Sequence, residues 1–424
     1  GKQICDSTGF TSFEANPEDI FSIIYTSGNT GTPKGVMLSH KNIVTQLHDI
    51  NKLIDLPKGE VALSLLPLAH IFERTVMSYY LSRGISIYFV DDVLNVANLM
   101  KVVKPTIMTV VPRLLEKIFN KIKAQILEKP FFSRVIASLA FSYALKENLD
   151  KSSILFKIYD KLVYSKFREI FGSKVEKLVS GGAPLSKEIA IFFVNIGVPV
   201  YQGYGMTEFS PVVSTNYPFA NKVGSCGKVI PSAQIKITAN NELLVRGDSL
   251  MLGYLNQEEL TKNTIDSDGW LHTGDVAHLD EDGYLFIKSR IKDIFKTSTG
   301  EYVNAVEIEQ RISKNRYIEF AVVISQNRKY TTALLFVDKE KYENAKKLNK
   351  NLTIEDYYNK DDILRNISSH INSVNSGLNK WEKIVKFKIL TNDISIETGE
   401  LTPSMKISRS KIEEKYENII NSMY

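Results

Sequence analysis

The chain has 424 residues, of which 43% are hydrophobic and 24% are charged, and its formal net charge is +5 at pH 7. Because single domains usually run to roughly 100–250 residues, we expect two or three domains. The composition is that of a globular protein and excludes a disordered or collagen-like chain. The charge is small for this length and gives no indication of nucleic acid binding.

Two cysteines, Cys5 and Cys226, are too few for a disulfide scaffold and are typical of a reducing compartment. No apolar run reaches the ~20 residues that span a bilayer, and the first residues lack the pattern of a signal peptide. We therefore predict a cytoplasmic protein, with attachment to the inner face of a membrane left open. Since the chain opens at Gly1 and soon reaches a strand-like run at Phe21, we expect an upstream segment to be missing.

Short β-branched and aromatic runs alternate with amphipathic stretches from Phe21 to about Tyr204. The runs predict buried strands, the stretches predict helices, and their alternation is typical of a parallel sheet covered by helices. The longest helical stretch, residues 113–146, is broken at Pro130 and has an apolar row beside lysines. Packing on its own domain is favoured there over a membrane-surface role. The six strand-like runs are FSIIYTS, VALSLLPL, ISIYFV, TIMTVVP, VEKLVSGG and VPVYQGYG.

Hairpin patterns follow beyond Pro211, with turns at residues 240–241 and 282–283, the second an Asp-Gly pair that predicts a type I′ turn. From Arg290 onward the pattern is α+β, with a helix expected over residues 305–312. The expected parts are an α/β portion (1–210), a small β-barrel-like subdomain (211–289) and a small α+β C-terminal domain (290–424, with strands at 320–324 and 331–337).

The strongest local signal is the loop YTSGNTGTPKG at residues 25–35. Its hydroxyls, glycines and single lysine form an anion cradle, because backbone N–H groups and hydroxyls can all point at phosphate oxygens. A Walker loop is excluded, since it needs Gly-Lys-Ser/Thr, whereas here Thr32 and Pro33 come between Gly31 and Lys34, and Gly35 follows the lysine. We predict binding of a triphosphate or pyrophosphate by Thr26, Ser27, Gly28, Thr30, Gly31, Thr32 and Lys34.

Six further motifs follow this loop in a fixed order. With the loop, they resemble the adenylate-forming superfamily, which includes acyl-CoA synthetases, peptide-synthetase adenylation domains and firefly luciferase. The resemblance covers residues 19–411, and QGYGMTEFSPVVS and LTPSMKI are most similar to long-chain fatty acyl-CoA synthetases. It implies an AMP-forming ligase that makes acyl-AMP and pyrophosphate from a fatty acid and ATP, and then acyl-CoA and AMP from CoA. The six motifs are LPLAHIFER, SGGAPL, YQGYGMTE, GWLHTGD, SRIKD and LTPSMKISR.

The resemblance also implies roles for individual residues around the nucleotide. Glu208 would be the Mg²⁺ ligand, which suits an ion that takes one or two carboxylates plus phosphate oxygens and waters. Thr207 would donate to the α-phosphate, and Tyr204 would offer its face to the adenine ring. Asp275 would accept from the ribose hydroxyls, and Arg290 would reach the ribose and phosphate. The close backbone wall is expected from Gly181, Gly182 and Ala183, and Gly205 is expected among the ATP- and AMP-binding residues.

Four more residues are implied to act in adenylation, in the change of domain orientation and along the paths of the acid and the thiol. Lys406 would bridge the carboxylate and the α-phosphate during adenylation, completing a catalytic set with Thr207 and Glu208. Lys292 matches the hinge between the two domain orientations. His70 would lie near the carboxylate and thiol path, although a core histidine is nearly as well supported. Gly300 ends a loop expected to line the pantetheine channel, where Thr299 replaces a commoner second glycine.

Amino-acid-activating relatives usually carry an aspartate near LPLAHIFER, and its absence here favours a simple carboxylic acid. The expected partners are a fatty acid, ATP and CoA, with Mg²⁺ and without nucleic acid or, from the histidine spacing, zinc. Three alternatives stay open: a fatty acyl-AMP ligase that serves a carrier protein, a short-chain or aryl acid ligase, and a catalytically silent lipid-binding remnant. Chain length of the acid and oligomeric state are not predicted.

Overall fold

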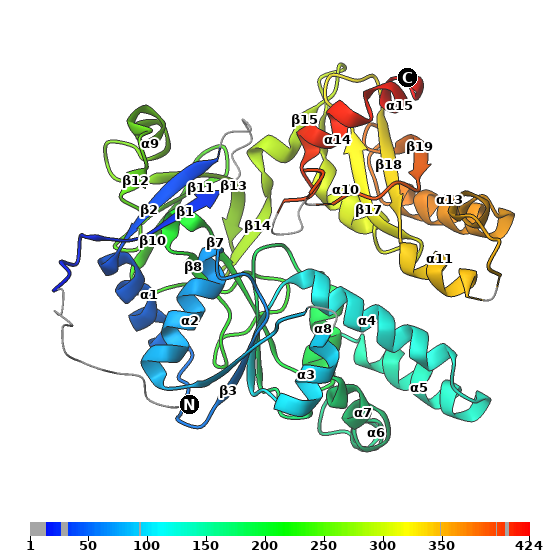
Figure 1. The fold of residues 1–424 in the computed structure, drawn as a ribbon, viewed down its shortest axis with the longest axis horizontal. Helices are drawn as coiled ribbons and strands as arrows, with labels where there is room; N and C mark the ends of the chain where they lie inside the picture. Colours follow the sequence, from blue (N-terminus) through cyan, green and yellow to red (C-terminus); the bar gives the residue numbers. More distant parts are fainter. Residues whose placement is uncertain (1–13, 27–32, 93–94, 348, 396, 403–406) are drawn as a thin grey trace.

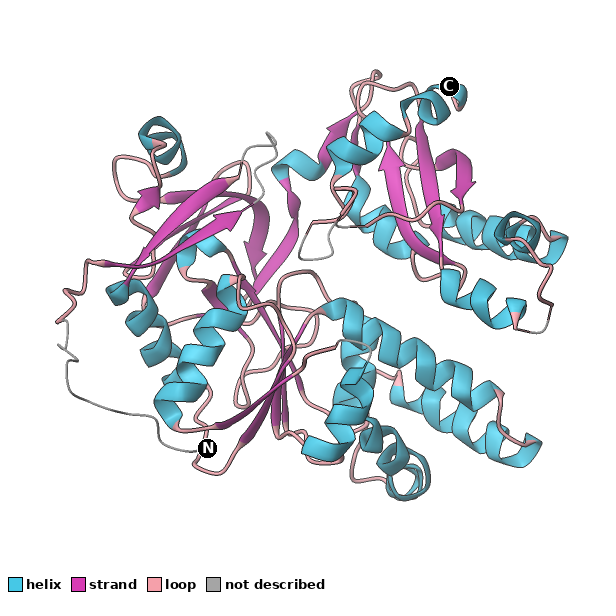
Figure 2. Cartoon of the chain, in the orientation of Figure 1, coloured by secondary structure: helices cyan, strands magenta, loops and turns pink. Residues whose placement is uncertain are grey.

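The structure is a computed structural model that describes residues 14–26, 33–92, 95–347, 349–395, 397–402 and 407–424. Figures 1 and 2 show a larger part that contains the N-terminal and middle residues and a smaller part built from the yellow to red end of the chain. The larger part combines sheets with covering helices, and the smaller part has its own sheet with helices beside it. The α/β fold followed by a small α+β unit is therefore confirmed. The limits at 210 and 289 stay a prediction.

The centre of the larger part is a seven-stranded sheet in the order β4-β3-β5-β6-β7-β8-β9. Its first five strands are parallel, as the alternating pattern predicts, whereas β8 and β9 are antiparallel. Helices bury one main core against it, with Met108, Phe192 and Phe193 at most 1% exposed. The strands are β3 (Val61–Ser64), β4 (Ser86–Phe89), β5 (Ile107–Val110), β6 (Lys177–Ser180), β7 (Val200–Gly205), β8 (Val212–Thr215) and β9 (Lys228–Val229). The helices around it include α1 (His40–Leu53), α2 (Ile71–Arg83), α3 (Val96–Val103) and α8 (Lys187–Asn195).

The first predicted strand does not belong to this sheet. β1 (Ile20–Thr26) pairs antiparallel with β2 (Lys34–Ser39), and β12 (Gly253–Tyr254) adds the third strand. Within β1 only Ile24 is buried, so the prediction of a buried parallel strand is wrong for this run. A short apolar run has no feature that identifies its neighbours, because its side-chain period is the same in either kind of sheet.

The long helical stretch separates at Pro130, as predicted, into α4 (Pro112–Leu127) and α5 (Phe131–Ala144). α4 buries Leu115, Ile118, Phe119, Ile122 and Ile126, so it packs on its own domain. α5 leaves much of its apolar surface exposed. Behind it follow α6 (Ile154–Tyr159), the π-helical turn η2 (Asp160–Tyr164) and α7 (Ser165–Arg168). Among the described residues, the helices are all too short or too polar to cross a membrane.

A four-stranded antiparallel sheet, in the order β10-β11-β13-β14, contains both predicted hairpins. Asn241 has φ 62° in the first turn, as expected for such a position. The second turn is not type I′, because only Gly283 has a positive φ and its N–H donates to the Asp280 carbonyl at 3.0 Å. It is a three-residue turn with glycine in the left-handed position. The strands are β10 (Ala233–Ile237), β11 (Glu242–Gly247), β13 (Leu271–Leu279) and β14 (Leu285–Arg290).

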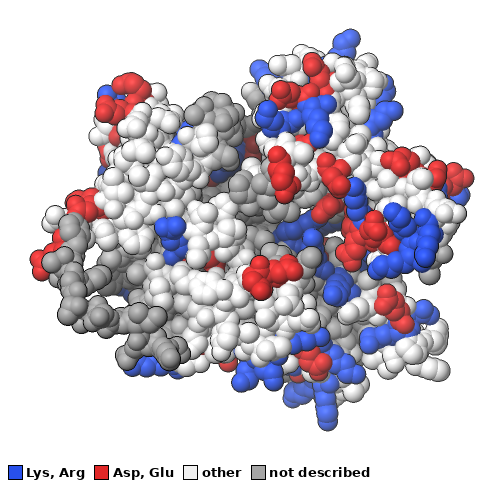
Figure 3. All heavy atoms as spheres, viewed as in Figure 1, with Lys and Arg blue, Asp and Glu red and all other residues white. Residues whose placement is uncertain are grey.

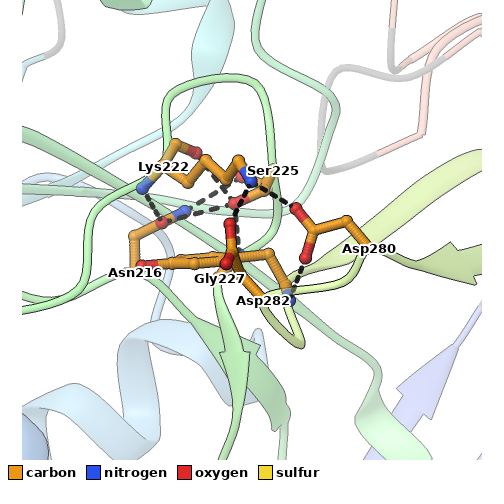
Figure 4. Close-up of polar contacts among 7 residues, drawn as sticks. Asn216, Lys222, Ser225, Gly227, Asp280 and Asp282 are labelled. Atoms are coloured by element: carbon orange, nitrogen blue, oxygen red, sulfur yellow. Dashed lines mark hydrogen bonds and ion pairs between the residues drawn. The ribbon is translucent and has the colours of Figure 1, made fainter.

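Lys222 fastens the segment before β9 to this second turn (Figure 4). Its ammonium group donates to Asp280 at 2.6 Å and Asp282 at 2.8 Å, and its backbone N–H donates to the Asn216 side chain at 2.9 Å. Asn216 is buried and also donates to the Ser225 carbonyl at 2.9 Å. The network ties a loop of the central sheet to the β13–β14 hairpin, which carries part of the site described below.

The smaller part contains a β15–β16 hairpin and the three-stranded sheet β17-β18-β19. The predicted helix over residues 305–312 is confirmed as α10. Arg113 of α4 contacts this part, because its guanidinium lies 3.5 Å from the Glu319 carboxylate and 5.2 Å from the Phe320 ring centre. The elements are β15 (Ile294–Lys296), β16 (Tyr302–Asn304), α10 (Ala305–Ile312), β17 (Ile318–Ile324), β18 (Thr331–Val337), α11 (Lys339–Lys346), α12 (Ile354–Tyr358), α13 (Asp361–Ser376), β19 (Ile384–Leu390), α14 (Arg409–Lys415) and α15 (Glu417–Ser422).

Candidate active site

The segment from Tyr204 to Glu208 links two clusters of polar side chains. It leaves the end of β7 and enters the short 3-10 helix η4 (Thr207–Phe209). Gly205 is required here, because a Cβ at this position would lie 2.1 Å from the Pro211 carbonyl oxygen. The buried Gln46 side chain donates to the carbonyls of Phe209 at 3.1 Å and Val212 at 2.9 Å. These contacts fix the backbone that presents the predicted adenine-facing and metal-binding residues.

Asp275 forms the first cluster with Tyr204 and Arg290. Asp275 and Arg290 are cross-strand neighbours on β13 and β14. The Tyr204 hydroxyl donates to one carboxylate oxygen at 2.5 Å, and Arg290 Nε donates to the other at 3.1 Å. The Asp275 side chain is 3% exposed, whereas that of Arg290 is 60% exposed. Three predicted nucleotide-binding residues are therefore in direct contact.

Burial determines the protonation behaviour of this cluster. It raises the pKa of Asp275, while the Arg290 charge and the Tyr204 hydroxyl act in the opposite direction. Burial, added to the charge of Asp275, raises the pKa of the Tyr204 phenol well above its ordinary value. Tyr204 therefore stays a hydrogen-bond donor throughout the physiological pH range.

Glu208 forms the second cluster with Tyr254 and Lys34. The Tyr254 hydroxyl donates to Glu208 Oε1 at 2.8 Å, and the Lys34 ammonium lies 5.2 Å from the centre of the Tyr254 ring. Tyr254 is on β12, next to β2, where Lys34 is the first residue. The structure therefore brings the phosphate-loop lysine close to the predicted metal-binding carboxylate through an aromatic ring.

The residues present fit a Mg²⁺ site that is completed by the nucleotide. Within the described ranges, no group of three or more His, Cys, Asp or Glu side chains could hold a metal by itself. Mg²⁺ in nucleotide sites typically uses one or two carboxylates, with phosphate oxygens and waters as its other ligands. Glu208 is half-buried, and its recorded hydrogen bond uses Oε1, so Oε2 is the oxygen that could face an ion.

The predicted phosphate loop connects β1 to β2. Thr26 and Lys34, which are described, are paired residues at the ends of these antiparallel strands. The remaining predicted residues of this loop, together with one catalytic residue, lie outside the described residues; they are Ser27, Gly28, Thr30, Gly31, Thr32 and Lys406.

The predicted glycine wall begins at the end of β6. Gly181 donates its N–H to the Val110 carbonyl at 3.2 Å, and a Cβ there would lie 3.1 Å from the Phe72 ring. Gly182, with φ +82°, and Ala183 are exposed. His70 is half-buried and directly precedes α2, which carries Phe72. Because Phe72 lies against Gly181 and is two residues after His70, the glycine wall and His70 belong to neighbouring segments.

The structure does not bring Gly300 to these clusters. Gly300 is exposed with φ +94°, and its N–H donates to the Thr297 carbonyl at 3.0 Å within its own loop. The backbone of Lys292 lies in the 3-10 helix η5 (Ile291–Asp293), between β14 and β15. Its position in the chain agrees with a hinge, and the role itself stays a prediction.

Two residues that contact the candidate site were not predicted from the sequence. Tyr254 lies 46 residues after Glu208 in the sequence, in no motif that we recognised. Thr273 is within GWLHTGD, where its hydroxyl accepts the N–H of Asp275 at 3.1 Å. Its position two residues before a functional aspartate is the signal that could have identified it, because Ser and Thr often bond backbone groups two residues away.

Comparison with known proteins extends these observations to the whole chain. A family model described as AMP-binding enzyme matches residues 5–255, and one described as AMP-binding enzyme C-terminal domain matches residues 292–424. The long-chain-fatty-acid–CoA ligase FadD15 of Mycobacterium tuberculosis is 32% identical over 417 residues, covering 96% of this chain and 69% of the relative. The long-chain-fatty-acid–CoA ligase ACSBG1 of Bos taurus is 33% identical, covering 96% of this chain and 62% of the relative.

Solved structures show the same fold. The adenylation domain of a carboxylate reductase from Mycobacterium chelonae has a TM-score of 0.74 at 23% identity, covering 96% of this chain and 60% of that one. O-succinylbenzoate CoA synthetase from Bacillus subtilis, in complex with ATP and magnesium ion, has a TM-score of 0.65 at 21% identity, covering 95% of this chain and 72% of that one. With the two family models and relatives above 30% identity across nearly all its length, the chain belongs to the AMP-binding enzymes of the adenylate-forming superfamily.

Proposed function

We propose that this chain is the larger portion of an AMP-forming long-chain fatty acid:CoA ligase. In the first half-reaction, a carboxylate oxygen attacks the α-phosphorus of ATP, and pyrophosphate leaves. In the second, the thiol sulfur of CoA attacks the acyl carbon of the acyl-adenylate, AMP leaves and the thiol proton is released. The observation that carries the proposal is the short Tyr204–Glu208 segment, which contacts Asp275 at one end and Tyr254, beneath Lys34, at the other.

The first cluster supports recognition of a nucleoside. A carboxylate offers about four lone-pair sites, and Tyr204 and Arg290 each use one of those on Asp275. Each oxygen therefore retains capacity for one hydroxyl of a ribose diol. Arg290 is largely exposed and can turn its guanidinium toward a phosphate without leaving Asp275 unpaired, because the Tyr204 hydroxyl still donates to it.

The second cluster supports charge neutralisation at the phosphates. A carboxylate substrate and ATP repel each other, so catalysis requires cations and fixed donors around the α-phosphate. Glu208 would hold Mg²⁺, which supplies positive charge to the phosphate oxygens when bound. Lys34 adds a side-chain cation over the ring of Tyr254, whose hydroxyl donates to Glu208, and Thr207 is the adjacent hydroxyl donor. Lys406 is assigned from its motif as the cation that meets the attacking carboxylate.

Two observations bear on the acid substrate: the names of the relatives support a long-chain acid, and the residues of one motif support a simple carboxylic acid over an amino acid. The curated relatives at 31–33% identity include long-chain-fatty-acid–CoA ligases from bacteria and vertebrates. The segment around LPLAHIFER has no aspartate to hold an amino group. The chain spans 59–74% of the relatives and structures described as similar, which makes activity of the chain by itself a separate question for experiment.

The test is ATP–pyrophosphate exchange with acetate, benzoate or palmitate, followed by thioester detection with and without CoA. We expect exchange with palmitate and conversion to palmitoyl-CoA. Exchange without a thioester at saturating CoA would favour an acyl-AMP ligase, and preference for acetate or benzoate would favour a short-chain or aryl ligase. Binding of palmitate without exchange would support the silent lipid-binding alternative. Lys34→Ala should slow exchange because it removes the phosphate-loop cation, and Lys58→Ala, at an exposed position in the loop before β3, is its matched control.

A further inference from the structure

The helical segment from α4 to α7 differs from the rest of the chain in charge. Residues 112–168 contain twelve Lys and Arg against five Asp and Glu, a net charge of +7. Because the whole chain has a net charge of +5, all other residues together are net negative by two. In Figure 3, blue basic side chains gather along the lower edge of the molecule, over the region of α6 and α7. The positive charge of this protein is therefore local.

The same segment exposes an unusual number of large apolar side chains. Residues 127–162 contain ten of the 27 exposed large hydrophobic residues in the described part of the chain. Scattered single exposed apolar residues are normal, but a concentration of them marks an interaction surface. We call these ten the hairpin surface: Leu127, Phe131, Phe132, Val135, Ile136, Leu139, Ile154, Leu155, Ile158 and Leu162.

The spacing on α5 shows that this exposure follows one face of the helix. Phe131, Val135 and Leu139 recur every four residues and are 63%, 42% and 56% exposed, while Ala137 and Ala140 on the opposite face are at most 4% exposed. The helix has one charge in 14 residues, Arg134. Fourteen residues are too few to span a bilayer, so an apolar face of this kind is suited to lying along a surface.

The α6–η2 segment repeats the pattern and adds the charges. Ile154, Ile158 and Leu162 recur every four residues and are 78%, 47% and 52% exposed. Lys157 and Lys161 are exposed at the intervening positions. An apolar row beside a basic row is the arrangement that places side chains among acyl chains and ammonium groups among anionic headgroups.

The two helices are held together as one unit. The Tyr143 and Tyr159 rings lie 5.5 Å apart, and the Tyr164 hydroxyl donates to the Ala140 carbonyl at 2.8 Å. Tyr164 is fully buried, so this contact belongs to the core of the unit. The two apolar rows are therefore presented by one rigid support that is backed by the main core of the larger part.

We propose that the hairpin surface is a docking site for an anionic lipid bilayer. The apolar rows enter the outer acyl region, and the surrounding lysines attract the headgroups. A protein partner would need both an extended apolar surface and an excess of acidic groups at one place. An anionic membrane presents acyl chains and anionic headgroups over its whole surface. The proposal does not depend on the ligase reaction, since binding is measured without ATP, acid or CoA.

The first experiment tests the apolar contribution. The purified chain is sedimented with vesicles of phosphatidylcholine, alone or mixed with phosphatidylglycerol, at low and high salt. We expect binding to the mixed vesicles, weakened by salt. The double variant Phe132→Ser/Ile154→Ser should lower the partition coefficient by about tenfold or more. Phe219→Ser is the matched control, because Phe219 is 94% exposed and lies outside the hairpin surface. The Phe219→Ser variant should bind the mixed vesicles as the unmodified chain does.

The second experiment tests the charge. Each lysine near an anionic surface contributes about fivefold to binding, so Lys157→Glu/Lys161→Glu should weaken it by at least about 20-fold. The exposed pair Lys58→Glu/Lys236→Glu makes the same change in net charge elsewhere and should weaken binding much less. All these residues are exposed, so unchanged circular dichroism and melting temperature verify the fold of each variant.

Three outcomes would overturn the proposal. One is a chain that stays in the supernatant with mixed vesicles at low salt. Another is an equal loss of vesicle binding in the hairpin-surface variants and in their controls, which would mean that net charge or nonspecific hydrophobic adsorption accounts for the sedimentation. The third is a dimer in analytical ultracentrifugation that Phe132→Ser/Ile154→Ser dissociates while vesicle binding is absent, which would assign the surface to a second copy of the chain.

Discussion

Replacement of Asp275 by asparagine separates nucleotide recognition from folding. The amide keeps the shape of the side chain and one oxygen that can accept from the Tyr204 hydroxyl. Its NH₂ group then faces Arg290 Nε, so one charge-assisted hydrogen bond, of about 1.5–3 kcal/mol, is lost. The loss is offset because a buried carboxylate no longer has to be desolvated and Arg290, 60% exposed, stays hydrated. We expect unfolding to become easier by at most about 1.5 kcal/mol, or a few degrees in melting temperature.

The effect on AMP binding should be much larger. Two ribose hydroxyls that donate to a carboxylate lose about 1.5 kcal/mol each when the acceptor is a neutral amide with one oxygen, which predicts about 10²-fold weaker binding. Burial raises the pKa of Asp275, and only the ionised form accepts from both hydroxyls. AMP affinity of the unmodified chain should therefore fall as the pH is lowered toward this raised pKa, and affinity of the variant should not follow the same curve.

Isothermal titration with AMP across pH, together with thermal melting, measures both effects. Asp282→Asn is the control, since Asp282 lies on the same hairpin but is 69% exposed and pairs with Lys222. An AMP affinity within threefold of the unmodified chain would refute the ribose assignment. A weak-binding variant that also melts more than ten degrees lower, on the order of several kcal/mol, would show that Asp275 is chiefly structural.

Three other predictions concern catalysis and stability. Glu208→Gln should lower ATP–pyrophosphate exchange by about 10²-fold, and exchange rates equal to those of the unmodified chain at low Mg²⁺ would exclude Glu208 as a ligand. Tyr254→Phe, which removes the hydrogen bond to Glu208 Oε1, should lower the exchange rate less and change the Mg²⁺ concentration that gives half-maximal exchange. Burial raises the pKa of Glu73, so the folded chain keeps a proton that the unfolded chain releases above about pH 4.5. The free energy of unfolding should therefore fall as the pH rises from about 4.5 through the raised pKa of the folded state. The urea midpoint of Glu73→Gln should not show this dependence on pH. Lys406→Ala should slow adenylation by about 10²–10³-fold but spare thioester formation from added acyl-AMP, and equal losses in single-turnover assays of both steps would contradict its assignment.

Local patterns were sufficient for several elements. The helix over residues 305–312, the break at Pro130 and both β-hairpins were predicted correctly because each depends on period, on a missing N–H or on a turn-forming residue within a few positions. The type of the second hairpin turn was wrong, because Asp-Gly is compatible with both a two-residue turn and a three-residue turn that ends in Gly283.

The motifs of the sequence by themselves determined the family and the residues predicted to carry the chemistry, because reacting side chains and close-packed glycines are required at fixed positions. Only the tertiary structure decided which partners those residues have. It paired the Tyr254 hydroxyl with Glu208, placed the strand before the phosphate loop outside the parallel sheet, and left one apolar face of α5 exposed while the apolar row of α4 was buried. These outcomes depend on contacts between segments far apart in the chain, and an apolar or tyrosine-containing stretch has the same local pattern whichever neighbour it meets.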